Sequence, residues 1–97
     1  MLTSKERNQL RVLEILLNSK CKDCGFNDLR VLNFDHRDRK KKKATISQLV
    51  HDGYSWDLIQ KEMAKCDIVC YNCHTRRECI RDNSPRQQYW EEYQKND

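Results

Sequence analysis

The sequence contains no long hydrophobic run. Its most apolar stretch, residues 12–17, is short and is interrupted by Glu14, so we expect no membrane-spanning helix. The first seven residues are mostly polar and do not resemble a secretory signal peptide. We therefore expect a cytoplasmic protein, in a reducing compartment where paired cysteines are better suited to metal binding than to disulfide bonds.

The sequence is also poor in apolar residues and has no strong excess of either charge. Hydrophobic residues make up 37% of the 97 residues and charged residues 35%, which predicts a thin core and a heavily charged surface. The 19 basic and 15 acidic residues give a formal net charge of +4, so the distribution of charge matters more than its sum. Without low-complexity segments or a linker, the chain is expected to form one small domain that benefits from a metal staple.

Four of the six cysteines form two Cys-x-x-Cys motifs, and these are the only internal repeat in the sequence. Two thiolates two residues apart can hold one metal ion from a tight turn, and two such turns complete a tetrahedral zinc site. The expected ligands of a structural zinc ion are Cys21, Cys24, Cys70 and Cys73. Cys66 and Cys79 are expected to be small, partly buried thiols without a role. An alternative is a thiol redox protein, which would use one motif alone and need no metal.

Helix caps and apolar spacing predict five helices and two short strands. A capping box at Thr3 and Glu6 begins a helix that runs from about Ser4 to Asn18. The other expected elements are a strand over residues 29–36, a short helix near 46–50, a helix after a Ser55 cap, a strand over 67–69, a helix from Cys73 or His74 to about Arg81, and a helix that starts at Ser84 and Pro85.

The apolar faces of these helices define the expected core. The first helix is expected to bury its leucines, and the two tryptophans and the tyrosines are interpreted as core residues rather than as platforms for stacked bases. The helical side chains placed in the core in this way are Leu10, Leu13, Leu16, Leu17, Trp56, Ile59, Met63, Tyr89, Trp90 and Tyr93.

Three further residues stand in a characteristic order relative to the cysteine motifs. Asp35 and His36 lie between the two motifs, and His74 follows the second motif directly. With its surroundings from residue 21 to residue 77, this order resembles the HNH endonuclease family, whose His-Me finger members include small zinc-stapled proteins of phages and bacteria. For a phage-encoded chain, the expected compartment would be the host cytoplasm.

The resemblance implies an α+β fold with a ββα-metal core, in which two strands and a helix hold one catalytic divalent ion, Mg²⁺ or Mn²⁺. It also implies that Asp35 and His74 bind this ion and that His36 is the general base. The expected organisation is a single domain, with an N-terminal helix in residues 1–20, the zinc-stapled core and a helical insertion in 21–82, and a C-terminal helix in 83–97.

The same residue types suit phosphodiester hydrolysis on chemical grounds. An imidazole, with an ordinary pKa of about 6.5, can accept the proton of an attacking water at neutral pH. A carboxylate and a second imidazole leave open positions on a metal ion for the phosphate and for water. Because neighbouring side chains of a regular strand point to opposite faces, we expect the strand to end or bend at Asp35 and His36.

The sequence departs from the family pattern at one position. Nine residues before His74, where the family has an asparagine that orients the loop bearing the base, this chain has Lys65. Asn72 or Asn33 could hold the loop instead, and Asn72 is also a candidate metal ligand. A residue that merely tolerates the tight cysteine turn is an equally good interpretation of Asn72.

Glu78 lies four residues after His74, so it shares one face of the expected helix. Two interpretations are open. Glu78 is either a further ligand of the catalytic ion or the ion-pair partner of Arg81 on the helix surface.

Six basic residues are crowded into residues 37–43, directly after the proposed base. Such a run repels itself and is expected to be an exposed loop. Beside a site that cleaves phosphodiesters, it is expected to contact DNA phosphates in a salt-dependent way that does not depend on base sequence. The expected DNA-contacting residues are Arg37, Arg39, Lys40, Lys41, Lys42, Lys43, Arg76 and Arg77.

The resemblance therefore implies a metal-dependent endonuclease that hydrolyses DNA phosphodiester bonds. One such site cuts one strand, so a monomer would nick DNA, and cutting both strands would require a dimer or a partner. The sequence does not decide between a monomer and a homodimer. A zinc-containing module that binds nucleic acid without catalysis is the alternative, and it gives Asp35 and His36 no chemical role.

Overall fold

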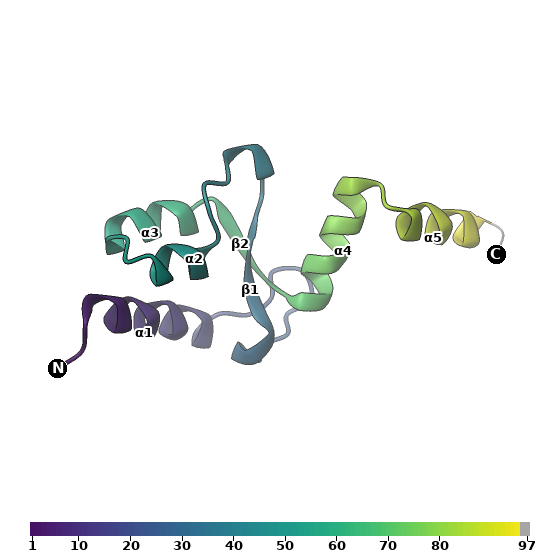
Figure 1. The fold of residues 1–97 in the computed structure, drawn as a ribbon. Coiled ribbons are helices and arrows are strands. Elements are labelled where there is room, and N and C mark those ends of the chain that lie inside the picture. The colour runs from purple at the N-terminus through teal and green to yellow at the C-terminus, as the bar shows by residue number, and fades with distance from the viewer. Residues whose placement is uncertain (96–97) are drawn as a thin grey trace.

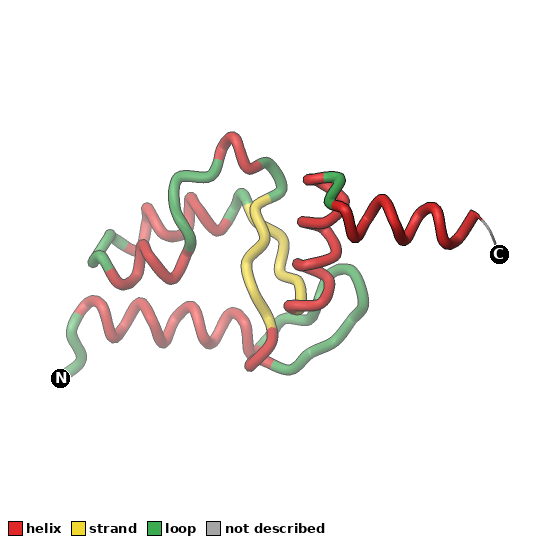
Figure 2. The backbone as a smooth tube through the Cα atoms, turned by 45° about the vertical axis from the view of Figure 1, so that its right-hand side comes forward, coloured by secondary structure: helices red, strands yellow, loops and turns green. Residues whose placement is uncertain are grey.

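The computed structural model describes residues 1–95 and has an α+β fold, with five α-helices around a two-stranded sheet (Figure 1). Helices α1, α2 and α3 lie on one side of the sheet, and α4 lies on the other (Figures 1 and 2). The elements in chain order are α1 (Ser4–Leu17), β1 (Leu32–His36), α2 (Ile46–His51), α3 (Trp56–Met63), β2 (Cys66–Cys70), α4 (Tyr71–Asp82) and α5 (Pro85–Lys95).

The two strands pair antiparallel, and their register places the expected site residues at one end of the sheet. Leu32 pairs with Cys70 at one end, and His36 pairs with Cys66 at the other. Strand β1 ends at His36, as predicted, and both Asp35 and His36 are buried. The expectation of a strand from residue 29 is wrong, because residues Leu29–Val31 form a 3₁₀ turn capped by Asp28.

The caps that start the helices agree with the sequence. Thr3 and Glu6 form the predicted capping box of α1, which ends at Leu17. Ser55 accepts a hydrogen bond from the backbone of Leu58 at the start of α3. A cap that the sequence analysis did not identify, Thr45, plays the same part for α2.

Helices α4 and α5 differ from expectation mainly at their ends. Helix α4 begins at Tyr71, before the predicted start, and ends at Asp82, because the positive φ of 46° at Asn83 stops the helix. Ser84 then accepts a hydrogen bond from the backbone of Gln87, and α5 begins at Pro85. Residues 96 and 97 of the predicted C-terminal helix lie outside the described residues.

The core is thin, as predicted, and it consists of two small clusters. One cluster joins the end of α1 to the sheet and the cysteines, and it contains Leu16, Cys21, Leu32, Val69, Cys70 and Cys73. The other joins α2 to α3 and contains Ile46, Leu49, Val50 and Ile59. Val12 and Phe34 pack against both clusters and so connect them.

The core prediction for α1 is wrong for three of its four leucines. Leu16 is buried, but Leu10, Leu13 and Leu17 are 47%, 39% and 63% exposed. The reason is the size of the domain, because the small core covers only one narrow stripe of the helix.

The core prediction is also wrong for the aromatic residues of α5. Tyr89, Trp90 and Tyr93 are 76%, 53% and 58% exposed. Helix α5 extends away from the sheet beyond α4, so no layer covers its aromatic side chains (Figure 1). Trp56 is different, since it is half-buried in the second cluster and the Arg11 guanidinium lies 5.2 Å above its ring.

The tyrosines outside α5 do not enter the core either. Tyr54 and Tyr71 are 42% and 54% exposed. No helix in residues 1–95 combines the length and the apolar character that a bilayer-spanning segment requires.

Candidate functional site

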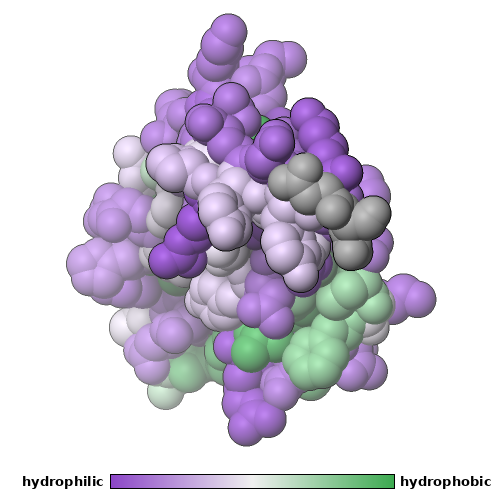
Figure 3. All heavy atoms as spheres, turned by 90° about the vertical axis from the view of Figure 1, so that its right-hand side faces the viewer, coloured by the Kyte–Doolittle hydropathy of each residue, from purple (hydrophilic) through white to green (hydrophobic). Residues whose placement is uncertain are grey.

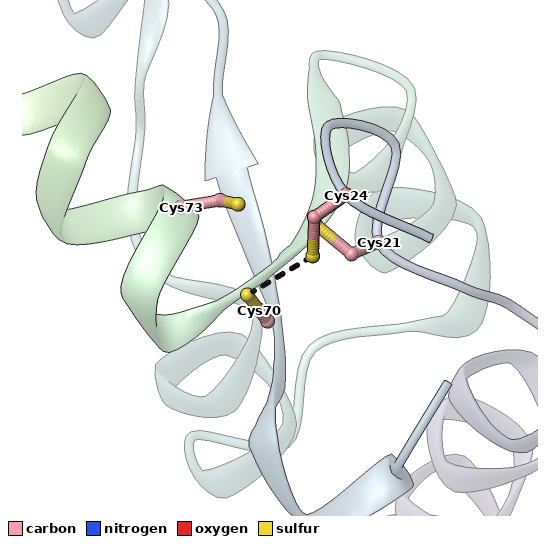
Figure 4. Close-up of side chains that lie close together, drawn as sticks. All are labelled: Cys21, Cys24, Cys70 and Cys73. Atoms are coloured by element: carbon pink, nitrogen blue, oxygen red, sulfur yellow. Dashed lines mark hydrogen bonds between the residues drawn. The ribbon is translucent and has the colours of Figure 1, made fainter. Parts of the chain in front are cut away.

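The four cysteines of the two motifs converge on one point between the end of α1 and the start of α4 (Figure 4). Their sulfur atoms all lie within 4.8 Å of one another, and the Cys24 and Cys70 sulfurs are 3.7 Å apart. Tetrahedral zinc with Zn–S bonds of about 2.3 Å separates its sulfur ligands by about 3.8 Å. The cluster can therefore hold a structural metal ion such as zinc with little rearrangement.

The backbone around Cys21 prepares this site. Gly25, with a φ of 81°, donates its N–H to the carbonyl of Cys21 and closes the turn. Lys22 donates its N–H to the carbonyl of Ile68, which ties the turn to β2. Although burial raises the pKa of Cys21, hydrogen bonds from the backbones of Cys70, Cys24 and Asp23 lower it to about 6.

A bound metal ion would also account for the crowding of the cluster. Burial and the neighbouring thiols raise the pKa of Cys73 to about 12, so four thiols this close do not all ionise by themselves. A bound cation would compensate the thiolate charges and release the protons. The redox alternative predicted one motif acting alone, whereas the structure joins both motifs.

The two remaining cysteines lie outside the cluster, as predicted. Burial raises the pKa of Cys66 to about 11, and its sulfur contacts the carbonyl of Glu62. A thiol of this kind is unreactive. Cys79 is half-buried on α4.

A second cluster of polar side chains surrounds a cavity of about 140 Å³ at the other end of the sheet. Strand β1, the basic loop that follows it and one face of α4 all contribute to its wall. The lining residues are Phe34, Asp35, His36, Arg39, Lys42, His74, Glu78 and Arg81. The three residues that the sequence assigns to catalysis, Asp35, His36 and His74, are thus brought to the same cavity.

Asp35 is the centre of this cluster and is only 1% exposed. One carboxylate oxygen accepts a hydrogen bond of 2.7 Å from His74 Nδ1, and the other accepts one of 2.8 Å from Arg77. Arg81 bonds both oxygens, at 3.0 and 2.6 Å. Burial raises the pKa of Asp35, but hydrogen bonds from Arg81, Arg77 and His74 outweigh it and lower the pKa to about 2.

The pair of Asp35 and His74 has the spacing of two neighbouring metal ligands. Their Oδ1 and Nδ1 atoms are 2.7 Å apart, against about 3.0 Å for adjacent ligands of an octahedral ion with bonds of about 2.1 Å. In the structure this separation is that of a hydrogen bond, and Arg81 binds the same carboxylate. Within residues 1–95, the cysteine cluster is the one place where three or more metal-binding side chains converge.

Glu78 does not form the ion pair with Arg81 that is one of its two expected arrangements. Its carboxylate lies 3.0 Å from His74 Nε2, the ring nitrogen opposite to the one that faces Asp35. Arg81 bonds Asp35 rather than Glu78. Glu78 is thus placed to orient the His74 ring.

His36 faces a residue that the sequence analysis did not identify. Its Nε2 atom lies 2.8 Å from a carboxylate oxygen of Glu62, and the two side chains are only 5% and 3% exposed. Glu62 follows Ile59 by one helical turn on the buried side of α3. A charged residue on the buried face of an amphipathic helix was the signal that could have identified it.

Lys65, at the position where the resemblance leads us to expect an asparagine, contacts the loop after β1. Its ammonium group donates hydrogen bonds to the carbonyl of Lys41, at 3.0 Å, and to Glu62, at 2.8 Å. Lys65 therefore braces the loop after the expected base. Asn72 instead lines a separate hollow of about 370 Å³ beside the cysteine cluster, and Asn33 pairs with Val69 in the sheet.

The basic loop is exposed, as expected, but its arginines are occupied. Arg37 donates to the carbonyls of Ala64 and Cys66, and Arg39 bonds Asp82 at 2.6 Å. The exposed cations of the loop that have no carboxylate partner within residues 1–95 are Lys40, Lys41, Lys42 and Lys43.

The two arginines expected to add to this surface differ in their environment. Arg77 makes two bonds of 2.7 Å to Asp23 and further bonds to Asp35 and Asp67, so the structure gives it a structural role. Arg76 is exposed, with one contact to the Cys73 sulfur.

Seen from the α5 end, the surface is mainly hydrophilic, with apolar side chains gathered near its lower edge (Figure 3).

Comparison with known proteins adds no further assignment. No family model matches the chain, and neither the curated proteins nor the solved structures give a match. The functional interpretation therefore depends on the residues and on their geometry.

Proposed function

We propose that the protein is a metal-dependent endonuclease of the HNH type, which hydrolyses phosphodiester bonds of DNA. The observation that carries the proposal is the convergence of Asp35, His36 and His74 at one small cavity, although they come from segments about 40 residues apart. The exposed lysines of residues 40–43 lie in the loop after His36 and offer an attraction for DNA phosphates that does not depend on base sequence.

His36 acts as the general base in this proposal. Its Nε2 atom is engaged by Glu62, so Nδ1 is the ring nitrogen available to take the proton of an attacking water. A divalent ion, Mg²⁺ or Mn²⁺, held by Asp35 and His74 would neutralise charge on the phosphate and stabilise the leaving oxygen. Lys42 and Arg39 line the same cavity and can attract the phosphate to it.

In this proposal, Arg81 connects the binding of a substrate phosphate to the release of Asp35 for the metal ion. It pairs with Asp35 in the structure, and its side chain is 26% exposed, so it can turn toward an anion that enters the cavity. A phosphate would offer the guanidinium a bidentate partner in place of the carboxylate. Asp35 would then have an oxygen free for the ion.

A zinc-containing module that binds nucleic acid without cutting it is the second candidate. The occupation of both Asp35 oxygens by arginine favours it, since a carboxylate held in this way serves the structure of the domain. The exposed lysines serve either function.

Nicking of supercoiled plasmid DNA in Mg²⁺ or Mn²⁺ separates the two candidates. We expect nicking by the wild type, a loss of about 100-fold or more in His36→Ala, and wild-type nicking in His51→Ala. His51 is a matched control because it is an exposed histidine of α2, outside the cavity. Undiminished nicking by His36→Ala would exclude His36 as the base, and DNA binding without nicking by the wild type would favour the binding module.

A further inference from the structure

Glu62 is a buried carboxylate for which the proposed reaction has so far given no task. It is 2% exposed, although it lies on a short helix of a small domain. One oxygen accepts hydrogen bonds from His36 Nε2, at 2.8 Å, and from the backbone N–H of Lys43, at 2.9 Å. The other accepts a bond of 2.8 Å from Lys65. Burial removes the hydrogen bonds that a carboxylate makes with water, so it is tolerated only when protein groups replace those bonds.

The state of Glu62 decides which nitrogen of His36 carries a proton. Burial raises the pKa of Glu62, but hydrogen bonds from Lys65, the Lys43 backbone and His36 outweigh it and lower the pKa to about 2. The carboxylate is therefore ionised at neutral pH and can only accept hydrogen bonds. His36 must donate from Nε2, so in the neutral form of the ring Nδ1 carries the lone pair.

The surroundings of His36 leave this lone pair accessible. Every side-chain nitrogen or oxygen atom of residues 1–95 that is itself shielded from solvent has a hydrogen-bond partner, so an atom without a partner must touch solvent. The hydrogen bond that His36 makes uses Nε2, and Nδ1 has no partner among these residues. Nδ1 therefore keeps contact with solvent, and His36 lines the cavity together with Asp35 and His74.

We infer that Glu62 is the positioning residue of the proposed nuclease site: it fixes the ring of His36 with Nδ1 toward the cavity. This inference rests on the proposed function. The same Glu62 oxygen holds the backbone of Lys43, so one carboxylate sets the position of the base and of the basic loop together. The proposed base and the lysines proposed to bind phosphate are thereby held in fixed positions relative to each other.

A purely structural role for Glu62 is the competing explanation. In that case the carboxylate would only anchor the loop, through Lys43 and Lys65, and its bond to His36 would be incidental. Lys65 offers a matched control for this explanation. Lys65→Met removes one brace of the loop but keeps the bond between Glu62 and His36.

The test is made on the zinc-loaded chain of 97 residues. The first measurement is the NMR signal of the His36 Nε2 proton, assigned by its loss in His36→Ala. We expect a downfield, slowly exchanging signal in the wild type and in Lys65→Met. Glu62→Met has a side chain of similar length without an acceptor, and we expect the signal to be lost. Glu62→Gln keeps a neutral acceptor and should shift the signal upfield without abolishing it.

The second measurement is plasmid nicking at saturating DNA. We expect turnover to fall about 10- to 100-fold in Glu62→Met with little change in KM, and to fall less in Glu62→Gln. A loop anchor would instead raise KM and would make Lys65→Met resemble Glu62→Met. Persistence of the ring-proton signal in Glu62→Met, or wild-type turnover in that variant, would overturn the inference.

The outcomes also separate this inference from the proposed function. A ring-proton signal that Glu62→Met abolishes, in a wild type that does not nick DNA, would reject the nuclease and keep the orientation of His36 by Glu62. Nicking that depends on His36 but not on Glu62 would support the nuclease and reject the positioning role of Glu62. If Glu62→Met does not fold, Glu62→Gln decides, because an unshifted signal with wild-type turnover in that variant contradicts the inference.

Discussion

The two ends of the β1–β2 sheet are held by opposite means. At the end where Leu32 pairs with Cys70, four thiols meet with few polar partners, and a metal ion such as zinc can join them. At the end where His36 pairs with Cys66, charged side chains satisfy one another through ion pairs and hydrogen bonds. The comparison teaches that the cysteine end is suited to stabilisation by a bound metal ion, whereas the polar groups of the cavity end are already paired with one another.

The largest expected effect is at the cysteine end. Cys21→Ser removes a buried ligand, and we expect the domain to unfold at 25 °C, because structural zinc contributes roughly 10–16 kcal/mol to small metal-dependent domains. Metal analysis should find about one zinc per wild-type chain, and circular dichroism should detect the loss of structure.

Cys79→Ser is the control for this prediction, since it changes a half-buried thiol outside the cluster. It should change the free energy of unfolding by less than about 1 kcal/mol. A metal-free wild-type chain that stays folded would remove the proposed difference between the two ends.

The next effect is expected at the cavity end. Asp35→Asn leaves Arg77 and Arg81 with an uncharged partner in a buried position. We expect a loss of about 3–5 kcal/mol in the free energy of unfolding, measured by urea denaturation with zinc present. Asp57→Asn, at an exposed position of α3, should cost less than about 1 kcal/mol. Equal effects of the two variants would mean that the cavity is not held by its charges.

A smaller effect is expected on the pH dependence of the free energy of unfolding. Glu62 has a pKa of about 2 in the folded protein, below its ordinary value of 4.5. A lowered acid pKa stabilises the fold above the unfolded value, and this contribution is lost as the pH falls from about 5 to about 2. We expect Glu62 to contribute about 2–3 kcal/mol to this loss.

Thermal melts of the wild type and of Glu62→Gln over this pH range test the prediction. Loss of zinc at low pH affects both proteins, so the difference between their curves isolates Glu62. Parallel curves would show that the carboxylate does not contribute.

The smallest effect is expected in a region that belongs to neither end. Trp90 stacks on Tyr93 with ring centroids 5.8 Å apart, but it is 53% exposed on α5. Trp90→Ala should therefore cost less than about 1 kcal/mol. Trp56→Ala should cost more, because Trp56 packs against the second core cluster. A larger cost for Trp90 would indicate that α5 packs more closely than the structure shows.

The parts of the fold that could be predicted depend on short stretches of sequence. Thr3, Glu6 and Ser55 mark the starts of helices because a cap satisfies backbone groups within a few residues. The spacing of Cys21 and Cys24 indicates a metal-binding turn for the same reason. The order of Asp35, His36 and His74 also suggested a shared site, and the structure brings them to one cavity.

The parts that could not be predicted depend on which surfaces meet. The exposure of Leu10, Leu13 and Trp90 follows from how little of each helix the small domain covers, which apolar spacing does not reveal. The pairing of Arg81 with Asp35 crosses 46 residues of sequence. An arginine on an exposed helix face carries no local sign of such a partner.

The sequence by itself determined where the helices start, that four cysteines form two metal-binding turns, and that an Asp-His pair precedes a basic run. These properties depend on the chemistry of neighbouring residues. Only the tertiary structure decided that Glu62 meets His36, that Lys65 braces the basic loop, and that arginines cover Asp35. Burial is the physical reason, because a charge removed from water takes the nearest available partner, and that partner is set by packing of distant segments.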